Sequence, residues 1–227
     1  MNHLKTYESF SYDGDNQYPQ KPLIGNPMFN MATAIRGGNI MGIKSLLDNG
    51  ANIEDKINGR TPLLFAFFED GGDEIIEFLI NNGANIEAKD KEGLTALMLS
   101  VLQQRVGLAL FLISNGADVN TIENLHNRTP LLLACYYDDE EMVEILTESG
   151  ADINAKDKYG WTPLILSSSE DNMGNVEYLI RAGADMNIKD NEGKTFIDYI
   201  EKDYQLDIIK DAVKKYQPEN IRLLDNK

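Results

Sequence analysis

Apolar residues fall along the chain in pairs of short blocks, and the pairs return at a nearly constant interval. A first block begins at Leu63, Leu97, Leu131 and Leu164, so that successive starts are about 33 residues apart, a period in the range of repeat proteins. After a polar turn, a second apolar block with helical spacing follows, at 75–80, 108–113, 142–146 and 176–180. Blocks of this length with apolar residues along one side predict short amphipathic helices. The pattern therefore predicts a repeated pair of helices.

Threonine and glycine mark the two ends of each pair. The threonines, which keep the same interval to within one residue, are Thr61, Thr95, Thr129, Thr162 and Thr195. The glycines keep it equally closely and are Gly50, Gly83, Gly116, Gly150 and Gly183. A threonine hydroxyl, followed in three copies by proline, caps the start of a helix, and glycine takes the left-handed conformation that ends one. A fixed period of this length predicts stacked repeats, each of which buries its apolar face against its neighbours.

The loops between a glycine and the next threonine are rich in Asp, Asn, Lys and Gly, which favours a projecting, hairpin-like turn. One such stretch, residues 150–164, reads GADINAKDKYGWTPL. Helix–turn–helix–hairpin units with a TPL start and a GAD end resemble the ankyrin repeat. The resemblance covers about residues 28–216, and it implies an all-α ankyrin-repeat solenoid of helix–turn–helix units with projecting β-hairpin-like loops.

The chain departs from the family at the position after TPL, where histidine is usual. Here the position holds Leu64, Met98, Leu132 and Ile165. This replaces the histidine's hydrogen bonds between repeats by apolar burial, so the predicted fold is unchanged.

The repeats divide the chain into three parts. Residues 1–27 are polar and irregular, and we expect a leader that packs Leu23 and Ile24 onto the first repeat. A single ankyrin-repeat domain follows at 28–216, with repeats at about 28–57, 58–90, 91–123, 124–157 and 158–190 and a capping repeat at 191–216. The first of these is degenerate, since it lacks the Thr-Pro start. Residues 217–227 are expected to form a short tail.

Two connections differ in length from the others. Compared with the other internal links between a glycine and the next threonine, the link from Gly116 to Thr129 is longer by one residue and the link from Gly50 to Thr61 is shorter by one. The second repeat also carries one extra residue within 69–74. Irregular loops are places where recognition can be adjusted, but surface loops also drift freely in length, and drift is the simpler interpretation.

The charge of the chain excludes some partners. With 21 basic and 37 acidic residues, its formal net charge is −16. Binding to nucleic acid depends on Lys and Arg, so neither nucleic acid nor an anionic membrane is expected as a partner. The chain shows no secretory signal and no apolar run long enough to span a membrane. Cys135 is the only cysteine, which favours a reducing compartment. We expect a cytoplasmic monomer, although export by a specialised secretion system is compatible with the same composition.

Residues suited to catalysis or metal binding are scarce. The only histidines are His3 and His126, and Cys135 follows Ala134 inside a predicted helix, where a packed thiol is the simpler interpretation. The acidic groups at 69–74 and 138–141 lack the ligand spacing of a calcium loop and suit the start of a helix instead. The formal glycosylation sequon at 127–129 coincides with a repeat start, and we discount it. We therefore expect no enzymatic activity, no cofactor and no metal site.

The resemblance implies a contact surface instead. In ankyrin-repeat proteins the concave side is the usual contact surface, formed by residues just before the TPL start and six to eight positions after its Thr. Carried over to this sequence, the candidate protein-binding residues are Arg60, Phe68, Leu94, Leu102, His126, Arg128, Tyr136, Tyr137, Tyr159 and Trp161. Aromatic residues and arginine dominate the energetics of interfaces. The alternative is that some rings pack between repeats, Phe68 and Tyr136 foremost, which leaves Tyr137 and Trp161 as the strongest candidates.

Two functions follow from these patterns. The favoured one is a non-catalytic protein–protein interaction module, an adaptor or inhibitor that holds a protein partner along the concave face and the hairpin tips. The alternative is an acidic, charge-led binder that neutralises or regulates a basic protein. Salt distinguishes them, because a charge-led complex weakens at high ionic strength and a complex formed through aromatic contacts persists.

Overall fold

The computed structural model describes residues 27–69 and 72–224. The chain divides after Ala84 into two compact units, Met1–Ala84 and Asn85–Lys227, called unit 1 and unit 2 below. Within the described residues, the regular elements are all helices, and one isolated antiparallel bridge joins Ile57 to Arg60. The predicted all-α class is thereby confirmed. The expected packing of Leu23 and Ile24 lies outside the described residues.

Unit 1 contains two helix pairs in its described part. Their helices are α1 (Pro27–Arg36), α2 (Ile40–Asp48), α3 (Pro62–Ala66) and α4 (Gly72–Asn81). Helix α1 packs on α2 and on α3, and α3 packs on α4. Pro27, which we assigned to the leader, is the first residue of α1, where its missing N–H costs no hydrogen bond. The loop predicted to hold an extra residue includes 70–71, which are outside the described residues.

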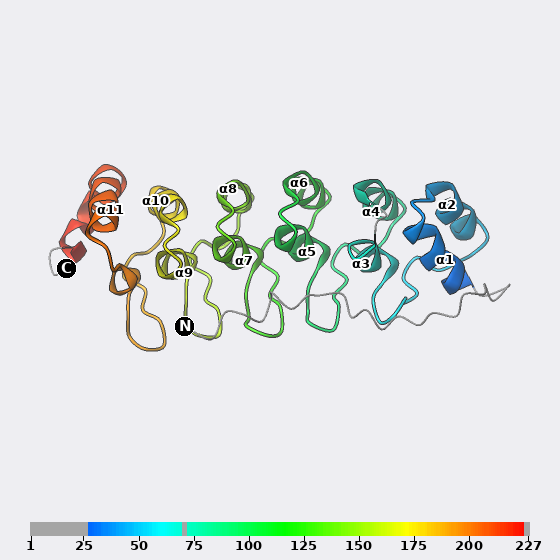
Figure 1. Ribbon diagram of the computed structural model, residues 1–227, viewed down its shortest axis with the longest axis horizontal. Coiled ribbons are helices and arrows are strands. Elements are labelled where there is room, and N and C mark those ends of the chain that lie inside the picture. Colours follow the sequence, from blue (N-terminus) through cyan, green and yellow to red (C-terminus); the bar gives the residue numbers. More distant parts are fainter. Residues whose placement is uncertain (1–26, 70–71, 225–227) are drawn as a thin grey trace. The chain divides into compact units, whose positions relative to one another are not determined.

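Unit 2 continues the same pairing. Its helix pairs are α5 (Ala96–Leu102) with α6 (Val106–Ser114), α7 (Pro130–Tyr136) with α8 (Glu140–Glu148), and α9 (Pro163–Ser169) with α10 (Met173–Arg181). In Figure 1 the first helices α5, α7 and α9 form one row and the second helices α6, α8 and α10 another, and the loops project beyond the row of first helices. The apolar sides of both rows face each other, so the core of the unit lies between them.

Three elements close unit 2 at its C-terminal end. They are the 3-10 helix η1 (Phe196–Tyr199), helix α11 (Asp203–Tyr216) and the 3-10 helix η2 (Pro218–Leu224). The interval we expected to be a tail therefore contains η2, which packs on α11 and buries Leu224. The Gln217 side chain donates hydrogen bonds to the carbonyls of Ile180, at 2.8 Å, and Ala184, at 3.1 Å. These bonds tie the residue after α11 to the C-terminal end of α10 and to the turn that follows it.

Threonine and glycine end the helices as their spacing predicts. The Oγ1 atoms of Thr95, Thr129 and Thr162 accept hydrogen bonds, at 3.3 to 3.4 Å, from the amide three residues further on. At the other end, Gly116 has φ of 91° and donates to Ile113 O, while Ala117 donates to Leu112 O, both at 3.0 Å. This pair of bonds is the Schellman arrangement that a left-handed glycine permits.

Apolar residues replace histidine at the position after each TPL without loss of packing. Leu64, Met98, Leu132 and Ile165 are all buried, with at most 1% of the residue exposed. Burying an aliphatic side chain of this size stabilises a fold by roughly 1.5–3 kcal/mol. The departure from the family pattern therefore adds to the core of each unit.

Candidate protein-binding face

The loops that project from unit 2, called fingers here, are residues 85–94, 118–128, 152–161 and 185–194. In three of them a buried aspartate lies at the base, at Asp90, Asp157 and Asp190. The Oδ1 atom of each accepts two amide hydrogen bonds, from the residues two and four positions further on, at 2.8 to 3.0 Å. A carboxylate that holds two amides of one turn fixes the course of the backbone. These aspartates were not among the predicted site residues, although each lies five residues before a repeat threonine.

The longer second finger of unit 2 uses glutamate in the same place. Glu123 lies six residues before Thr129 and accepts hydrogen bonds from the amides of Leu125, His126 and Arg128. The additional methylene of glutamate lets the carboxylate reach across the additional residue. The unusual length of this link is therefore accommodated by one matching side chain.

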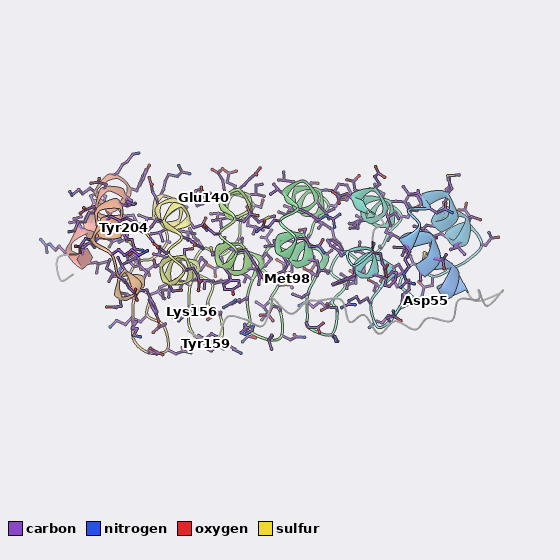
Figure 2. The ribbon with its side chains drawn as sticks, viewed as in Figure 1. Asp55, Met98, Glu140, Lys156, Tyr159 and Tyr204 are labelled. Atoms are coloured by element: carbon purple, nitrogen blue, oxygen red, sulfur yellow. The ribbon has the colours of Figure 1, made fainter. Side chains whose placement is uncertain are left out.

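Neighbouring fingers are joined by backbone hydrogen bonds. The amides of Asn124, Lys158 and Asn191 donate to carbonyls of the preceding finger, those of Glu92, His126 and Tyr159, at 2.8 to 3.1 Å. Lysine side chains add further bonds, such as Lys156 Nζ to the carbonyl of Lys189 at 3.0 Å. Figure 2 shows Lys156 and Tyr159 on one finger, whereas Glu140 lies at the row of second helices. The fingers of unit 2 thus form a connected surface.

Aromatic side chains follow one another along this surface. The ring centroids of Tyr159 and Trp161 are 6.4 Å apart, and those of Trp161 and Tyr199 are 5.5 Å apart in an edge-to-face arrangement. His126 lies 6.2 Å from Tyr159 on the other side. The three rings Tyr159, Trp161 and Tyr199 are half-buried, so each keeps part of its surface accessible. We call these three residues the aromatic row.

Tyr199 was not predicted, because it lies in the capping repeat and outside the register of the other candidates. Its hydroxyl donates to Asp190 Oδ2, so the finger base and the aromatic row share one hydrogen bond. Burial, together with the adjacent carboxylate of Asp190, raises the pKa of the Tyr199 hydroxyl above its ordinary value. Tyr199 therefore stays protonated and continues to donate this bond.

A buried ion pair lies beneath the aromatic row. Arg128 Nε is 3.5 Å from Asp157 Oδ2, and at most 1% of either side chain is exposed. The guanidinium also lies 5.2 Å from the ring centroid of Tyr136. Burial raises the pKa of Asp157, against the opposing effects of the Trp161 and Tyr159 amides and of Arg128. One side chain, Arg128, thus links the end of α7 to the base of the next finger.

The predicted site residues of unit 2 fall into two groups. Leu102, Tyr136, Tyr137, Tyr159 and Trp161 are half-buried and accessible at the surface. Leu94, His126 and Arg128 have no more than 4% of the residue exposed, which differs from the prediction that they contact a partner directly. Of the three, Arg128 has an ion pair with the base of a finger, through Asp157. Burial is also the main cause of the lowered pKa of His126, with Arg128 and Lys158 adding to it against Glu123.

The remaining two candidates lie together in unit 1. Arg60 Cζ is 4.0 Å from the ring centroid of Phe68, and both residues are half-buried. Arg60 precedes the repeat threonine and Phe68 follows it by seven residues, which is also the register of Arg128 and Tyr136 in unit 2. The same sequence register thus produces the same cation-over-ring contact in both units.

Reactive groups are few within the described ranges. Burial raises the pKa of the Cys135 thiol to about 12, so the thiolate nucleophile is not formed near neutral pH. No group of three or more His, Cys, Asp or Glu side chains in residues 27–69 and 72–224 is arranged to hold a metal ion. No helix among the same residues is long and apolar enough to cross a membrane.

Paired helices, glycine-ended turns and projecting fingers define the class of proteins built from stacked helical repeats. The family model for ankyrin repeats in three copies matches residues 30–123 and 121–190. The chain therefore belongs to the ankyrin repeat family, as its motifs predict.

Comparison with solved structures finds many matching chains, one of which is an ankyrin repeat domain. The crystal structure of the ankyrin repeat domain of Bcl-3, described as a unique member of the IkappaB protein family, matches with a TM-score of 0.60 and 22% identity. The match covers 80% of this chain and 97% of that domain, and at this identity it supports the fold alone. A search of curated proteins finds no match.

Proposed function

We propose that this protein is a non-catalytic interaction module that holds a protein partner against the fingers and first helices of unit 2. The observation that carries the proposal is the aromatic row, which keeps three adjacent rings accessible on a surface joined by hydrogen bonds between fingers. Rings that are already fixed lose little conformational freedom when a partner covers them, so most of their contact energy remains available for binding. Membership of the ankyrin repeat family supports the same conclusion.

Tyr137 extends this surface towards α7. Its ring contacts Tyr136 edge-to-face, with centroids 5.0 Å apart, and Tyr137 is itself half-buried. A partner that spans Tyr137 and Trp161 would touch two successive repeats. The module would act as an inhibitor if the bound face of the partner includes the partner's active surface, and as an adaptor if that surface stays free.

The test is affinity capture with the full chain as bait. Bait with Trp161→Ala and Tyr137→Ala should lose the partner that the unchanged chain retains. The matched control is Tyr178→Ala, because Tyr178 is a half-buried tyrosine on α10, in the row of second helices. Equal recovery by the double variant and the control would refute the proposal.

A second candidate, a charge-led binder of a basic protein, is favoured by the carboxylates at the start of α8. Asp138, Glu140 and Glu141 are exposed. Burial, followed by the negative charges of Glu140 and Asp139, raises the pKa of Asp138, which shows that like charges crowd this turn. Capture repeated at low and high salt distinguishes the two candidates. A complex that disappears at high salt in the unchanged chain supports the charge-led candidate.

A further inference from the structure

The chemistry of the partner can be inferred from an incomplete charge balance beneath the aromatic row. The guanidinium of Arg128 is ion-paired to Asp157, and its positive charge also acts on the carboxylate of Glu170. Arg128 is engaged by Asp157, so it is not an ion-pair partner of Glu170. Among the described residues, no cation lies within ion-pair distance of Glu170, and its carboxylate accepts no hydrogen bond.

Glu170 is well placed to meet a ligand. It directly follows α9 as the C-cap residue, and it is half-buried, so its carboxylate is partly removed from water yet accessible. Burial is the main cause of its raised pKa, and the positive charge of Arg128 opposes it only in part. A cation beside Glu170 would stabilise the ionised form of its carboxyl group, which burial disfavours.

A repeated register shows which chemical group is missing. In two repeats a cation precedes the repeat threonine and lies over the ring seven residues after it: Arg60 over Phe68 and Arg128 over Tyr136. In the fifth repeat the residue before the threonine is Trp161, and the one seven residues after it is Ser169, next to Glu170. At these register positions the fifth repeat therefore supplies a ring and a neighbouring carboxylate, but no cation.

The neighbouring rings already have cations. Lys158 Nζ lies 5.0 Å from the centroid of Tyr159, and Lys194 Nζ lies 5.4 Å from that of Tyr199. Within the described residues no Lys or Arg lies over Trp161, although indole is the aromatic side chain that attracts cations most strongly. Trp161, an accessible ring without a cation over it, therefore belongs to the same repeat as Glu170, a carboxylate without an ion-pair partner among the described residues.

We propose that Trp161 and Glu170 bind an arginine side chain presented by a basic segment of the partner. The guanidinium plane would stack on the indole while its N–H groups donate to the carboxylate. Arginine fits better than lysine because its planar fork both stacks and donates two parallel hydrogen bonds. This inference rests on the proposed function, since it assigns a partner chemistry to the same face.

The preceding repeat offers a second position for a basic residue. Tyr137 is followed by Asp138 and Asp139, so a ring again adjoins carboxylates. Packed helices lie about 8–10 Å apart, which an extended chain spans in about three residues. The best-fitting segment therefore carries two basic residues three positions apart.

The sole tryptophan of the chain makes this proposal directly measurable. Trp161 emission reports on this one site, because the sequence contains no other tryptophan. The probe is an acetylated and amidated peptide of glycine and serine with arginine at its second and fifth positions, titrated into the full chain at low salt. We expect a saturable change in emission, and a matched peptide with citrulline in place of arginine should bind about tenfold more weakly, since it keeps the shape but loses the charge.

Two variants locate the interaction. Glu170→Gln should weaken the arginine peptide about tenfold and leave thermal unfolding unchanged, because this carboxylate accepts no hydrogen bond from the described residues. The control is Glu177→Gln, which removes the same charge from an exposed position on α10 in the same repeat. Equal affinity for arginine and citrulline peptides, or unchanged affinity in Glu170→Gln, would overturn the proposal.

The outcome can be separated from that of the proposed function. Suppose that the natural partner needs Trp161 and Tyr137 but binds the Glu170→Gln chain as tightly as the unchanged chain. The binding face would then stand, and the arginine inference would fail. If the partner is indifferent to Trp161 and Tyr137 as well, the proposed function itself fails.

Discussion

Asp157 and Asp190 occupy the same position in successive fingers, yet the pKa values of their carboxyl groups shift in opposite directions. Burial raises the pKa of Asp157, and its two amide bonds and Arg128 only partly oppose this. Burial acts on Asp190 as well, but the Tyr199 hydroxyl and the amides of Lys194 and Glu192 outweigh it, so its pKa lies below the ordinary value. The second oxygens also differ in their partners, since Oδ2 of Asp157 lies 3.5 Å from Arg128 Nε and Oδ2 of Asp190 accepts a hydrogen bond from Tyr199.

Replacing each of these aspartates by asparagine should lower the free energy of unfolding by different amounts. Asp190→Asn removes a charge that the Tyr199 hydroxyl and two amides stabilise, so we expect a loss of about 1.5–3 kcal/mol in the free energy of unfolding, the range for hydrogen bonds to a charged group. Asp157→Asn keeps an oxygen for the finger amides and removes a charge that burial disfavours, so a loss of less than about 1.5 kcal/mol is expected. Denaturant unfolding measures both. A larger loss in Asp157→Asn than in Asp190→Asn would contradict this order.

The lowered pKa of Asp190 predicts a dependence of stability on acid. A carboxyl whose pKa is lowered in the folded state contributes stability above its unfolded value, here 3.8, and this contribution is lost as the pH falls through the folded value. Below pH 3.8 the unchanged chain should therefore lose stability more steeply than Asp190→Asn. The difference in slope should be at most about 1.4 kcal/mol per pH unit, which corresponds to one proton. Parallel curves in this range would contradict the assignment.

Asn58 is expected to be the asparagine that deamidates first. Of the four Asn-Gly pairs, those at Asn49, Asn82 and Asn115 end helices, and each side-chain amide donates to a backbone carbonyl four residues earlier, at 2.7 to 2.9 Å. The amides of the glycines that follow them are hydrogen-bonded as well. Deamidation requires that glycine nitrogen to attack the side-chain carbonyl, so these bonds slow it.

Asn58 lies instead at the exposed turn closed by the Ile57–Arg60 bridge, with φ of 53°. Peptide mapping by mass spectrometry after incubation at mildly alkaline pH should find Asp and isoaspartate at Asn58 before any other Asn-Gly pair. The three helix-end pairs serve as internal controls. Earlier conversion at any of these three would contradict the prediction.

At the scale of elements, the second finger of unit 2 shows how an insertion is absorbed. Glu123 reaches amides that aspartate would not reach across the additional residue. Glu123→Asp should therefore destabilise unit 2 by about 1.5–3 kcal/mol, the range for hydrogen bonds to a charged group. Combining Glu123→Asp with deletion of Leu125 restores the spacing of the other fingers and should recover most of that loss. If thermal unfolding shows no recovery in the combined variant, the match between side-chain length and loop length is not the reason for glutamate here.

The sequence predicts those features of an element that depend on residues close by along the chain. Thr129 caps a helix three residues away, and Gly116 ends one through bonds to residues just before it, so both can be recognised from spacing alone. Arg128 and Tyr199 are different, because their roles come from contacts with Asp157 and Trp161, which lie far from them along the chain. Arg128 was therefore expected at the surface although it is buried, and Tyr199 was not considered. The aspartates at the finger bases carried a periodic signal that could have been found.

At the scale of the whole molecule, a net charge of −16 bears on association more than on the fold. Long-range attraction speeds the approach of a basic partner and fades with salt, whereas close contacts with buried rings determine how long the complex lasts. The aromatic row and the acidic surroundings thus have separate kinetic roles. A partner with arginine in an exposed basic segment would use both.

The most direct test of the proposed binding face is the dissociation constant of the purified partner for three forms of the full chain. The chain carrying Trp161→Ala and Tyr137→Ala should bind at least about 30-fold more weakly than the unchanged chain, because a central aromatic contact contributes about 2 kcal/mol or more. The control Tyr178→Ala should bind within about twofold of the unchanged chain, and all three forms should unfold cooperatively. Equal affinity for the double variant and the unchanged chain would contradict the account.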